Sequence, residues 1–147
     1  VAIKLWIAAK NANVGTLATG GGSGVQWMFA ERAAKDGVTF LVAFSLADGS
    51  FEPRSRHDVA EALHRFFPEA ELIGWDWHDW IEDPWARGTW VATPADMPWI
   101  ADNSEWLPQG RVFFASSDFS HDSPGWFEAA IISGETAAQG VASLLNG

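Results

Sequence analysis

The chain has 147 residues, among them ten tryptophans and ten phenylalanines but no tyrosine and no cysteine, and it carries a net charge of −10 with a pI near 4.6. The length suits one ordinary hydrophobic core. The absence of cysteine excludes disulfides and thiolate metal sites, and the acidity argues against nucleic acid or an anionic membrane as a partner. Ten tryptophans exceed what so small a core normally uses, so several are expected to line a cavity or a subunit contact.

The first expected element is a strand over residues 1–9. Its residues alternate between two faces, with Val1, Ile3, Leu5 and Ile7 on one and Ala2, Lys4, Trp6 and Ala8 on the other. This period of two predicts a strand with one buried face. Lys4 lies on the more polar face, where the simplest interpretation is a surface lysine whose stem packs along the sheet. Because the chain starts inside this run, we expect it to be part of a longer protein.

The glycine-rich segment Gly15–Gly24 follows. It lacks the Gly-Lys-Ser/Thr ending of a P-loop and the G-x-G-x-x-G spacing of a dinucleotide-binding turn. Its composition therefore favours a flexible connection.

A sheet with one helix is expected next. Residues 25–29 and 39–45 predict two strands around a charged turn at 31–37, in the order of a hairpin. Residues 57–67 predict an amphipathic helix that Pro68 ends, with Asp58 favourable in its first turn. Residues 71–77 predict another strand.

The C-terminal part predicts a strand, a polar loop and a helix. Residues 112–115 form a short apolar run typical of a strand buried on both faces of a parallel sheet. After the loop, apolar or small residues recur at a spacing near 3.6 and predict the buried face of a helix, at Phe127, Ala130, Ile131, Gly134, Ala138, Val141 and Leu145. Asp122 or Ser123 is expected to cap this helix, with Pro124 in its first turn. A helix N-terminus at the end of a strand suits an anionic or polarisable ligand.

Three segments together resemble one family. Residues 113–138 are similar to the C-terminal end of flavin-dependent amine oxidases of the monoamine oxidase-like group, where a last strand and a flavin-contacting loop precede a helix of the pattern GW/GY-x-E-x-A-x-x-S-G. Ile3-Lys4 resembles the "I-K" strand of that group, and residues 79–90 resemble its "W…DPxxxGxY/W" segment. The resemblance covers nearly the whole chain. The family's N-terminal G-x-G-x-x-G half is missing from it and is expected from another chain or segment of the same enzyme.

The resemblance implies an α+β or α/β fold in two parts. Residues 1–100 would belong to the substrate-binding domain, a mostly antiparallel sheet with a helix. Residues 101–147 would supply the last strand and helix of the Rossmann-like FAD-binding domain.

The resemblance also implies roles for individual side chains around the cage and the flavin N5. Lys4 would be the catalytic lysine that holds a water or O2 near N5. Trp80 would flank the flavin. Trp90 and Trp126 would form the two walls of an aromatic cage for the amine, although well-known members have tyrosine there. Taken singly, each of these tryptophans would be assigned to a hydrophobic core.

Further contacts to the cofactor follow from the same resemblance. Thr89 stands where some members carry a cysteine bonded to the flavin, so FAD is expected to be non-covalent. Ser117 and Asp118 lie in the flavin-contacting loop, with Asp118 toward the ribityl or phosphate region. Gly125 and Phe127, together with Trp126, would contact the cofactor at the start of the helix. The loop departs from the family in reading Ser-Ser-Asp rather than Gly-Thr-Glu.

The expected function is oxidation of an amine to an imine, with O2 reduced to H2O2. One alternative is an L-amino acid oxidase, which needs an arginine for the substrate carboxylate, and Arg87 is the only arginine near a cage residue. Another is a non-catalytic Trp-rich binding module that would fold and bind alone. The expected partner is the FAD-binding remainder of the enzyme, in a hetero- or homo-oligomer. No nucleic acid or membrane partner is expected, and the expected location is cytoplasmic.

Three His-Asp dipeptides do not alter these expectations. Their histidines, His57, His78 and His121, match no metal-ligand spacing, and the chain has no G-x-S-x-G nucleophile motif. We therefore expect no metal, and His121, beside the proposed cage, is the one of most interest.

Overall fold

The computed structural model describes residues 3–20, 22, 24–89, 107–119 and 123–146. The chain divides into two compact units, Val1–Thr89 and Trp90–Gly147. The predicted domain boundary after residue 100 lies outside the described residues and stays a prediction.

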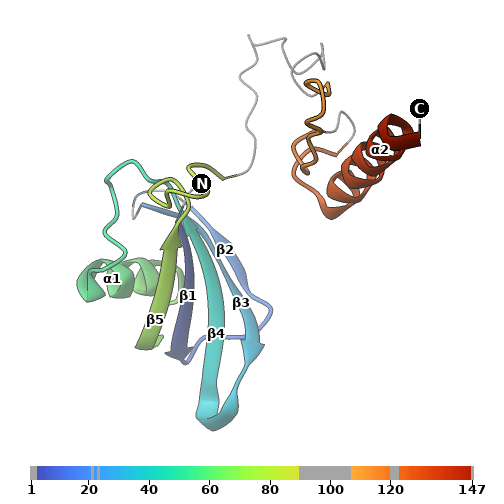
Figure 1. Cartoon of the computed structure of the whole chain (residues 1–147). Helices are drawn as coiled ribbons and strands as arrows, with labels where there is room; N and C mark the ends of the chain where they lie inside the picture. Colours follow the sequence, from blue (N-terminus) through green and yellow to red (C-terminus); the bar gives the residue numbers. More distant parts are fainter. Residues whose placement is uncertain (1–2, 21, 23, 90–106, 120–122, 147) are drawn as a thin grey trace. The chain divides into compact units, whose positions relative to one another are not determined.

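The first unit is built on a five-stranded sheet in the order β2-β3-β4-β1-β5 (Figure 1). Its strands are β1 (Ile3–Lys10), β2 (Leu17–Thr19), β3 (Val25–Ala33), β4 (Val38–Ser45) and β5 (Glu71–Asp79). All the pairs are antiparallel, and β1 lies between β4 and β5. The four predicted strands and the β3–β4 hairpin are confirmed. A short 3-10 helix, η1 (Lys35–Gly37), forms the hairpin turn.

The prediction of a flexible connection over Gly15–Gly24 is wrong, because this segment contains β2. Leu17 pairs with Phe29 of β3, and the flanking backbone is also bonded to β3: the Gly15 N–H donates to the Ala30 carbonyl at 2.7 Å, and the Gly20 N–H donates to the Gln26 carbonyl at 3.1 Å. The free edge of β3 offers these hydrogen bonds, and they outweigh the low strand propensity of glycine. Composition alone cannot reveal such an edge.

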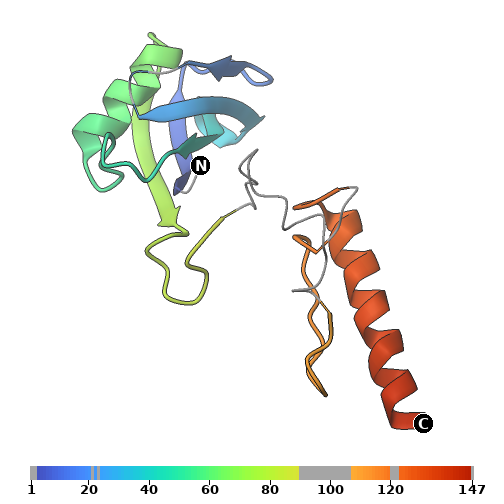
Figure 2. The same cartoon turned by 90° about the horizontal axis from the view of Figure 1, so that it is seen from above.

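The core of this unit lies between the sheet and one helix. Alternate residues of the strands face α1 (Arg56–Phe66), which lies against one face of the sheet (Figure 2). Leu5, Met28, Leu41, Val59 and Leu63 are all fully buried there. The predicted amphipathic helix is therefore confirmed, shifted by one residue.

Ser55 caps α1. Its hydroxyl accepts a hydrogen bond from the Asp58 N–H at 3.2 Å and donates one to the Asp58 carboxylate at 2.7 Å. The Ser55 hydroxyl, followed by the Glu52 N–H, holds the pKa of Asp58 below its usual value. An N-terminal cap of this kind contributes about 1 kcal/mol to stability.

Replacing Ser55 with alanine is therefore expected to lower the free energy of unfolding by about 1 kcal/mol at pH 7. The pKa of Asp58 is lower in the folded state than in the unfolded state, where it is about 3.9. The ionised Asp58 carboxylate therefore stabilises the fold above this unfolded pKa, and the stabilisation is lost as the pH falls through the folded pKa. The deficit of the Ser55→Ala variant should therefore shrink at pH 3, as measured by urea unfolding at both pH values. A deficit that stays constant between pH 7 and pH 3 would contradict this assignment.

The second unit contains α2 (Phe127–Asn146), which confirms the predicted C-terminal helix. Among the described residues no helix has both the length and the apolarity to cross a bilayer. Pro124 precedes the helix rather than lying in its first turn. Ser123, the one predicted cap within the described residues, accepts the Trp126 N–H with its carbonyl at 3.1 Å, in the turn before the helix.

Two predictions about the C-terminal part are wrong. Residues 112–115 form no strand, because Val112 makes only an isolated bridge to Gln109, and Val112 and Phe114 are 56% and 40% exposed. The expected buried face of α2 is also exposed at Phe127 and Ile131, whereas Ala129 and Ser133 are buried. A strand inside a parallel sheet needs a neighbour on each edge, and the described part of this unit supplies none. Periodicity shows which residues share a face but not what covers it.

Small residues of α2 pack against the segment that precedes the helix. The Ser133 hydroxyl accepts a hydrogen bond from the Ser116 N–H at 3.2 Å. At Gly140 an added Cβ would lie only 2.5 Å from the Phe113 ring. These contacts hold residues 107–119 along one side of the helix.

Candidate functional site

The predicted site residues are distributed over both units. Lys4, Trp80 and Thr89 belong to the first, and Ser117, Asp118, Gly125, Trp126 and Phe127 belong to the second. Trp90 and His121 lie outside the described residues, so the aromatic cage stays a prediction.

Lys4 lies on the face of the sheet opposite α1, which we call the open face. Its ammonium lies 5.2 Å from the ring centre of Trp6 and 5.8 Å from that of Phe44, within the range of cation–π attraction. Trp27 of β3 stacks on Phe44, with ring centres 4.3 Å apart. A half-buried lysine thus lies among aromatic rings on this face, rather than on a purely polar surface.

Sheet register places His78 directly opposite Lys4. Lys4 pairs with Phe44 on one side and with His78 on the other. Facing residues of an antiparallel pair point to the same side of the sheet, with Cβ atoms about 5 Å apart. The open face therefore carries Lys4, Trp6, Trp27, Phe44 and His78.

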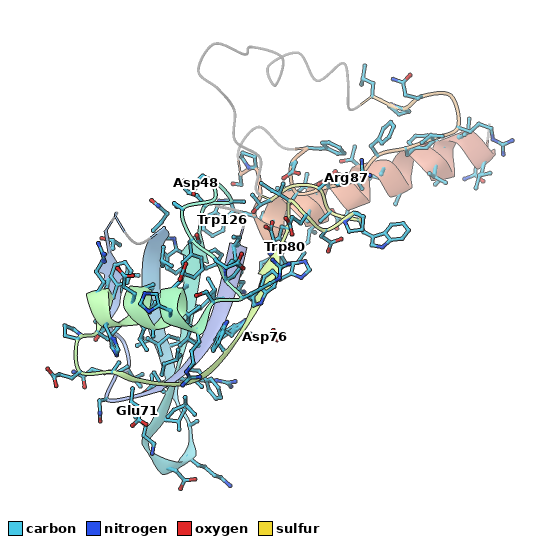
Figure 3. All side chains as sticks on the ribbon, turned by 90° about the vertical axis from the view of Figure 1, so that its left-hand side faces the viewer. Asp48, Glu71, Asp76, Trp80, Arg87 and Trp126 are labelled. Carbon is cyan, nitrogen blue, oxygen red and sulfur yellow. The ribbon has the colours of Figure 1, made fainter. Side chains whose placement is uncertain are left out.

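Trp80 lies in a closed loop immediately after β5, with Arg87 in the same loop (Figure 3). The Gly88 N–H donates to the Trp80 carbonyl at 2.9 Å, and the Asp79 carboxylate accepts the N–H groups of Ile81 and Glu82. Local backbone and aspartate hydrogen bonds thus fix the loop over residues 79–88.

His78 connects Trp80 to Lys4. The His78 ring contacts the Trp80 ring edge to face, with centres 4.3 Å apart and planes at 64°. The His78 Nε2 lies 2.9 Å from an oxygen of Asp83, whose other oxygen accepts the Trp85 N–H at 2.8 Å. The Trp85 N–H is the main cause that lowers the pKa of Asp83; the His78 hydrogen bond acts in the same direction and burial opposes both.

Sequence reasoning treated His78 only as one of three His-Asp dipeptides. Two features of the sequence could have identified it. His78 lies near the end of a strand, two residues before Trp80, a spacing that puts the two side chains on the same side. An aspartate, Asp83, follows five residues after it. Its position opposite Lys4 depends on register between segments more than sixty residues apart, which the sequence pattern does not define.

In the second unit, four predicted cofactor residues gather around one hollow. It has a volume of about 300 Å³ and is lined by Ser117, Gly125, Trp126, Phe127 and Ala130. Gly125 has a φ of +84°, which favours glycine, and its N–H donates to the Ser117 carbonyl at 2.9 Å. Trp126, at the start of α2, is 70% exposed (Figure 3).

Two further predicted residues are not part of these clusters. Asp118 is half-buried outside the lining of the hollow, and its N–H donates to the Ser116 hydroxyl at 3.2 Å. Thr89 is exposed at the end of the first unit. Among the described residues, no group of three His, Cys, Asp or Glu side chains is arranged to hold a metal ion.

The fold and these residues define a class of protein. The family model of the flavin-containing amine oxidoreductases matches residues 2–142, and the chain belongs to that family. The resemblance seen in the sequence is thereby confirmed, and with it the expectation of a flavin cofactor.

Individual relatives agree with this assignment. The chain is 32% identical over 139 residues to (S)-6-hydroxynicotine oxidase of Paenarthrobacter nicotinovorans, covering 95% of this chain and 32% of that protein. It is 31% identical over 120 residues to a pseudooxynicotine dehydrogenase of a Pseudomonas species, covering 82% of this chain and 24% of that protein. The chain thus spans about a third or less of the length of these relatives.

Solved structures share the fold. Wild-type putrescine oxidase bound to putrescine matches with a TM-score of 0.70 and 22% identity, covering 97% of this chain and 35% of that one. A triple mutant of putrescine oxidase with redesigned cofactor binding matches with a TM-score of 0.71 and 20% identity, with the same coverage. The expected antiparallel sheet with a helix against it is therefore the fold of a flavin amine oxidase.

The hollow of the second unit suits a flavin. Its lining combines aromatic and small side chains with the N-terminus of a 20-residue helix, whose positive end favours negative charge. Gly125 has a positive φ, which favours glycine, and the turn therefore carries no Cβ at this position. A flat, partly anionic ring system is compatible with this set of groups.

Proposed function

We propose that the protein containing this chain oxidises an amine to an imine, using FAD held without a covalent bond, and passes the electrons to O2 to give H2O2. Family membership supports the reaction class. The observation that carries the proposal is that Lys4 and Trp80 both neighbour His78: Lys4 faces it across the sheet, and the Trp80 ring contacts its ring. Two residues proposed for one flavin site are thus close in the structure although 75 residues separate them in the sequence.

The bound flavin would accept a hydride from the carbon next to the amine nitrogen. Trp90 and Trp126 would be the walls that hold the amine in line for this transfer, an orientation effect. Trp80, Thr89, Ser117, Gly125 and Phe127 would hold the cofactor, and Asp118 would contact its ribityl or phosphate region. The N-terminus of α2 would stabilise negative charge on the reduced ring system.

Lys4 would have two effects on the open face. Its ammonium would hold water or O2 near the flavin during reoxidation. Its positive charge would also oppose the binding of a protonated amine and so favour the neutral amine, the form that can release a hydride. Nearby aromatic rings partly balance this charge by cation–π attraction, on the order of 0.5–2 kcal/mol per contact.

The substrate class follows from the open face and the relatives. Trp6, Trp27 and Phe44 form an aromatic surface beside Lys4. Two relatives are named for 6-hydroxynicotine and pseudooxynicotine. We propose an amine carried near an aromatic ring, which would stack on this surface.

The rest of the enzyme would supply what this chain lacks. Residues 1–100 would be part of the substrate-binding domain, and residues 101–147 would complete an FAD-binding domain. The dinucleotide-binding half would come from the remaining length that the relatives have.

The test is to purify the complete protein and record its absorbance, then measure H2O2 formed from an arylalkyl amine and from its α-carboxylated analogue. We expect flavin bands and turnover of the simple amine. Preference for the carboxylated analogue, lost in an Arg87→Ala variant, would favour an L-amino acid oxidase instead. A protein that carries no flavin would contradict the proposal.

A further inference from the structure

The end of β5 carries a histidine, His78, and its contacts on two sides both concern the proposed site. On one side His78 contacts Trp80 edge to face at 4.3 Å, and on the other it is fixed by Asp83 at 2.9 Å. Asp83 is itself held by the Trp85 N–H, and its side chain is only 21% exposed. The Asp83 carboxylate, itself held in place, thus fixes the position of the His78 imidazole.

The partner of His78 determines its tautomer. A carboxylate can only accept a hydrogen bond, so Nε2 of His78 carries a proton and donates it to Asp83. This bond fixes the orientation of the ring, although 48% of the His78 side chain is exposed.

Charged groups surround His78 on each neighbouring element. Lys4 faces it from β1, and Asp76 lies two residues earlier on the same side of β5. From the loop, Glu82 and Asp83 line the same hollow as His78. These acidic groups offset the positive charge of Lys4 beside the His78 ring.

We propose that His78 is a positioning residue of the flavin site: anchored by Asp83, its ring sets the orientation of the Trp80 indole. This inference rests on the proposed function, which makes Trp80 a residue that flanks the flavin. His78 would thereby shape the cofactor site without itself touching the cofactor.

The experiment uses the complete flavoprotein in wild-type form and as His78→Ala, His78→Phe and His57→Ala. His57 is the matched control, because its side chain is 87% exposed on α1, on the other face of the sheet. The protein is labelled with 5-fluorotryptophan, and the Trp80 resonance is assigned as the one missing from a Trp80→Phe variant. Visible circular dichroism of the bound flavin and steady-state kinetics are measured in parallel.

We expect the Trp80 fluorine resonance to move from its wild-type position in His78→Ala, to return most of the way in His78→Phe, and to stay in place in His57→Ala. His78→Ala should alter the flavin dichroism and lower kcat about two- to tenfold, whereas His78→Phe, which restores a ring, should recover most of both.

The inference is overturned if the Trp80 resonance has the same position in His78→Ala as in His57→Ala. It is also overturned if His78→Ala has the flavin dichroism and kcat of His57→Ala. The proposed function fails separately: a protein without flavin bands or amine turnover refutes it, whatever the fluorine spectra show. If flavin and turnover are present but Trp80 does not respond, only the inference about His78 fails.

Discussion

Replacing Lys4 with methionine is expected to slow reoxidation of the reduced enzyme by O2 about a hundredfold, the usual cost of removing one preorganised polar group from a reaction centre. Methionine keeps the length of the side chain and its contacts with Trp6 and Phe44, so the change mainly removes the positive charge. The measurement is stopped-flow mixing of anaerobically reduced enzyme with oxygenated buffer. Reduction by the amine, followed separately without O2, should change by less than about tenfold.

Lys10 provides the matched control for this experiment. It lies at the other end of β1 on the same side of the strand and is exposed. Lys10→Met should leave both half-reactions at the wild-type rate. If Lys4→Met slows reduction by the amine while reoxidation is unchanged, the proposed role of Lys4 with O2 is wrong.

Truncating Leu5 to alanine should have the largest effect on stability, lowering the free energy of unfolding by about 3 kcal/mol. Leu5 is fully buried in the inner strand β1, paired with Ala43 and Trp77, and it belongs to the same core cluster as Leu63 of α1. The interior cannot close fully around the removed methyl groups, so a cavity remains. Urea unfolding, followed by circular dichroism, gives the difference in the free energy of unfolding from the shift in the unfolding midpoint.

Ile73→Ala is the comparison for Leu5→Ala. Ile73 lies on the edge strand β5 and is 43% exposed, so its truncation should cost less than about 1 kcal/mol. Equal losses at both positions would mean that the sheet is not packed on α1 as described.

The sheet could be predicted where its strands alternate clearly. β1 and β4 bury every second side chain, and that period is visible in the sequence. β2 could not be predicted, because its glycines and small residues form a strand only through pairing with β3. Residues 112–115 were predicted as a strand from their apolar character and from the family resemblance. A strand and an irregular segment packed beside a helix share that apolar character.

The candidate site could be predicted only in part. Spacing and resemblance identified Lys4, Trp80 and the residues that gather around the hollow before α2. His78 was not assigned to the site, because its meaning arises from three contacts with residues on another strand and in a later loop. Contacts of that kind depend on tertiary structure and leave no regular period in a single chain.

The position of β1 has a consequence for how the chain is synthesised. Among the strands of this sheet β1 is synthesised first, yet one of its two neighbours, β5, begins only at Glu71. Until that segment emerges, one edge of an apolar strand has no hydrogen-bonding partner, and such an edge can pair with other nascent chains. Truncated chains that stop before residue 71 should therefore aggregate during expression, and holding chaperones would matter most during this interval of translation.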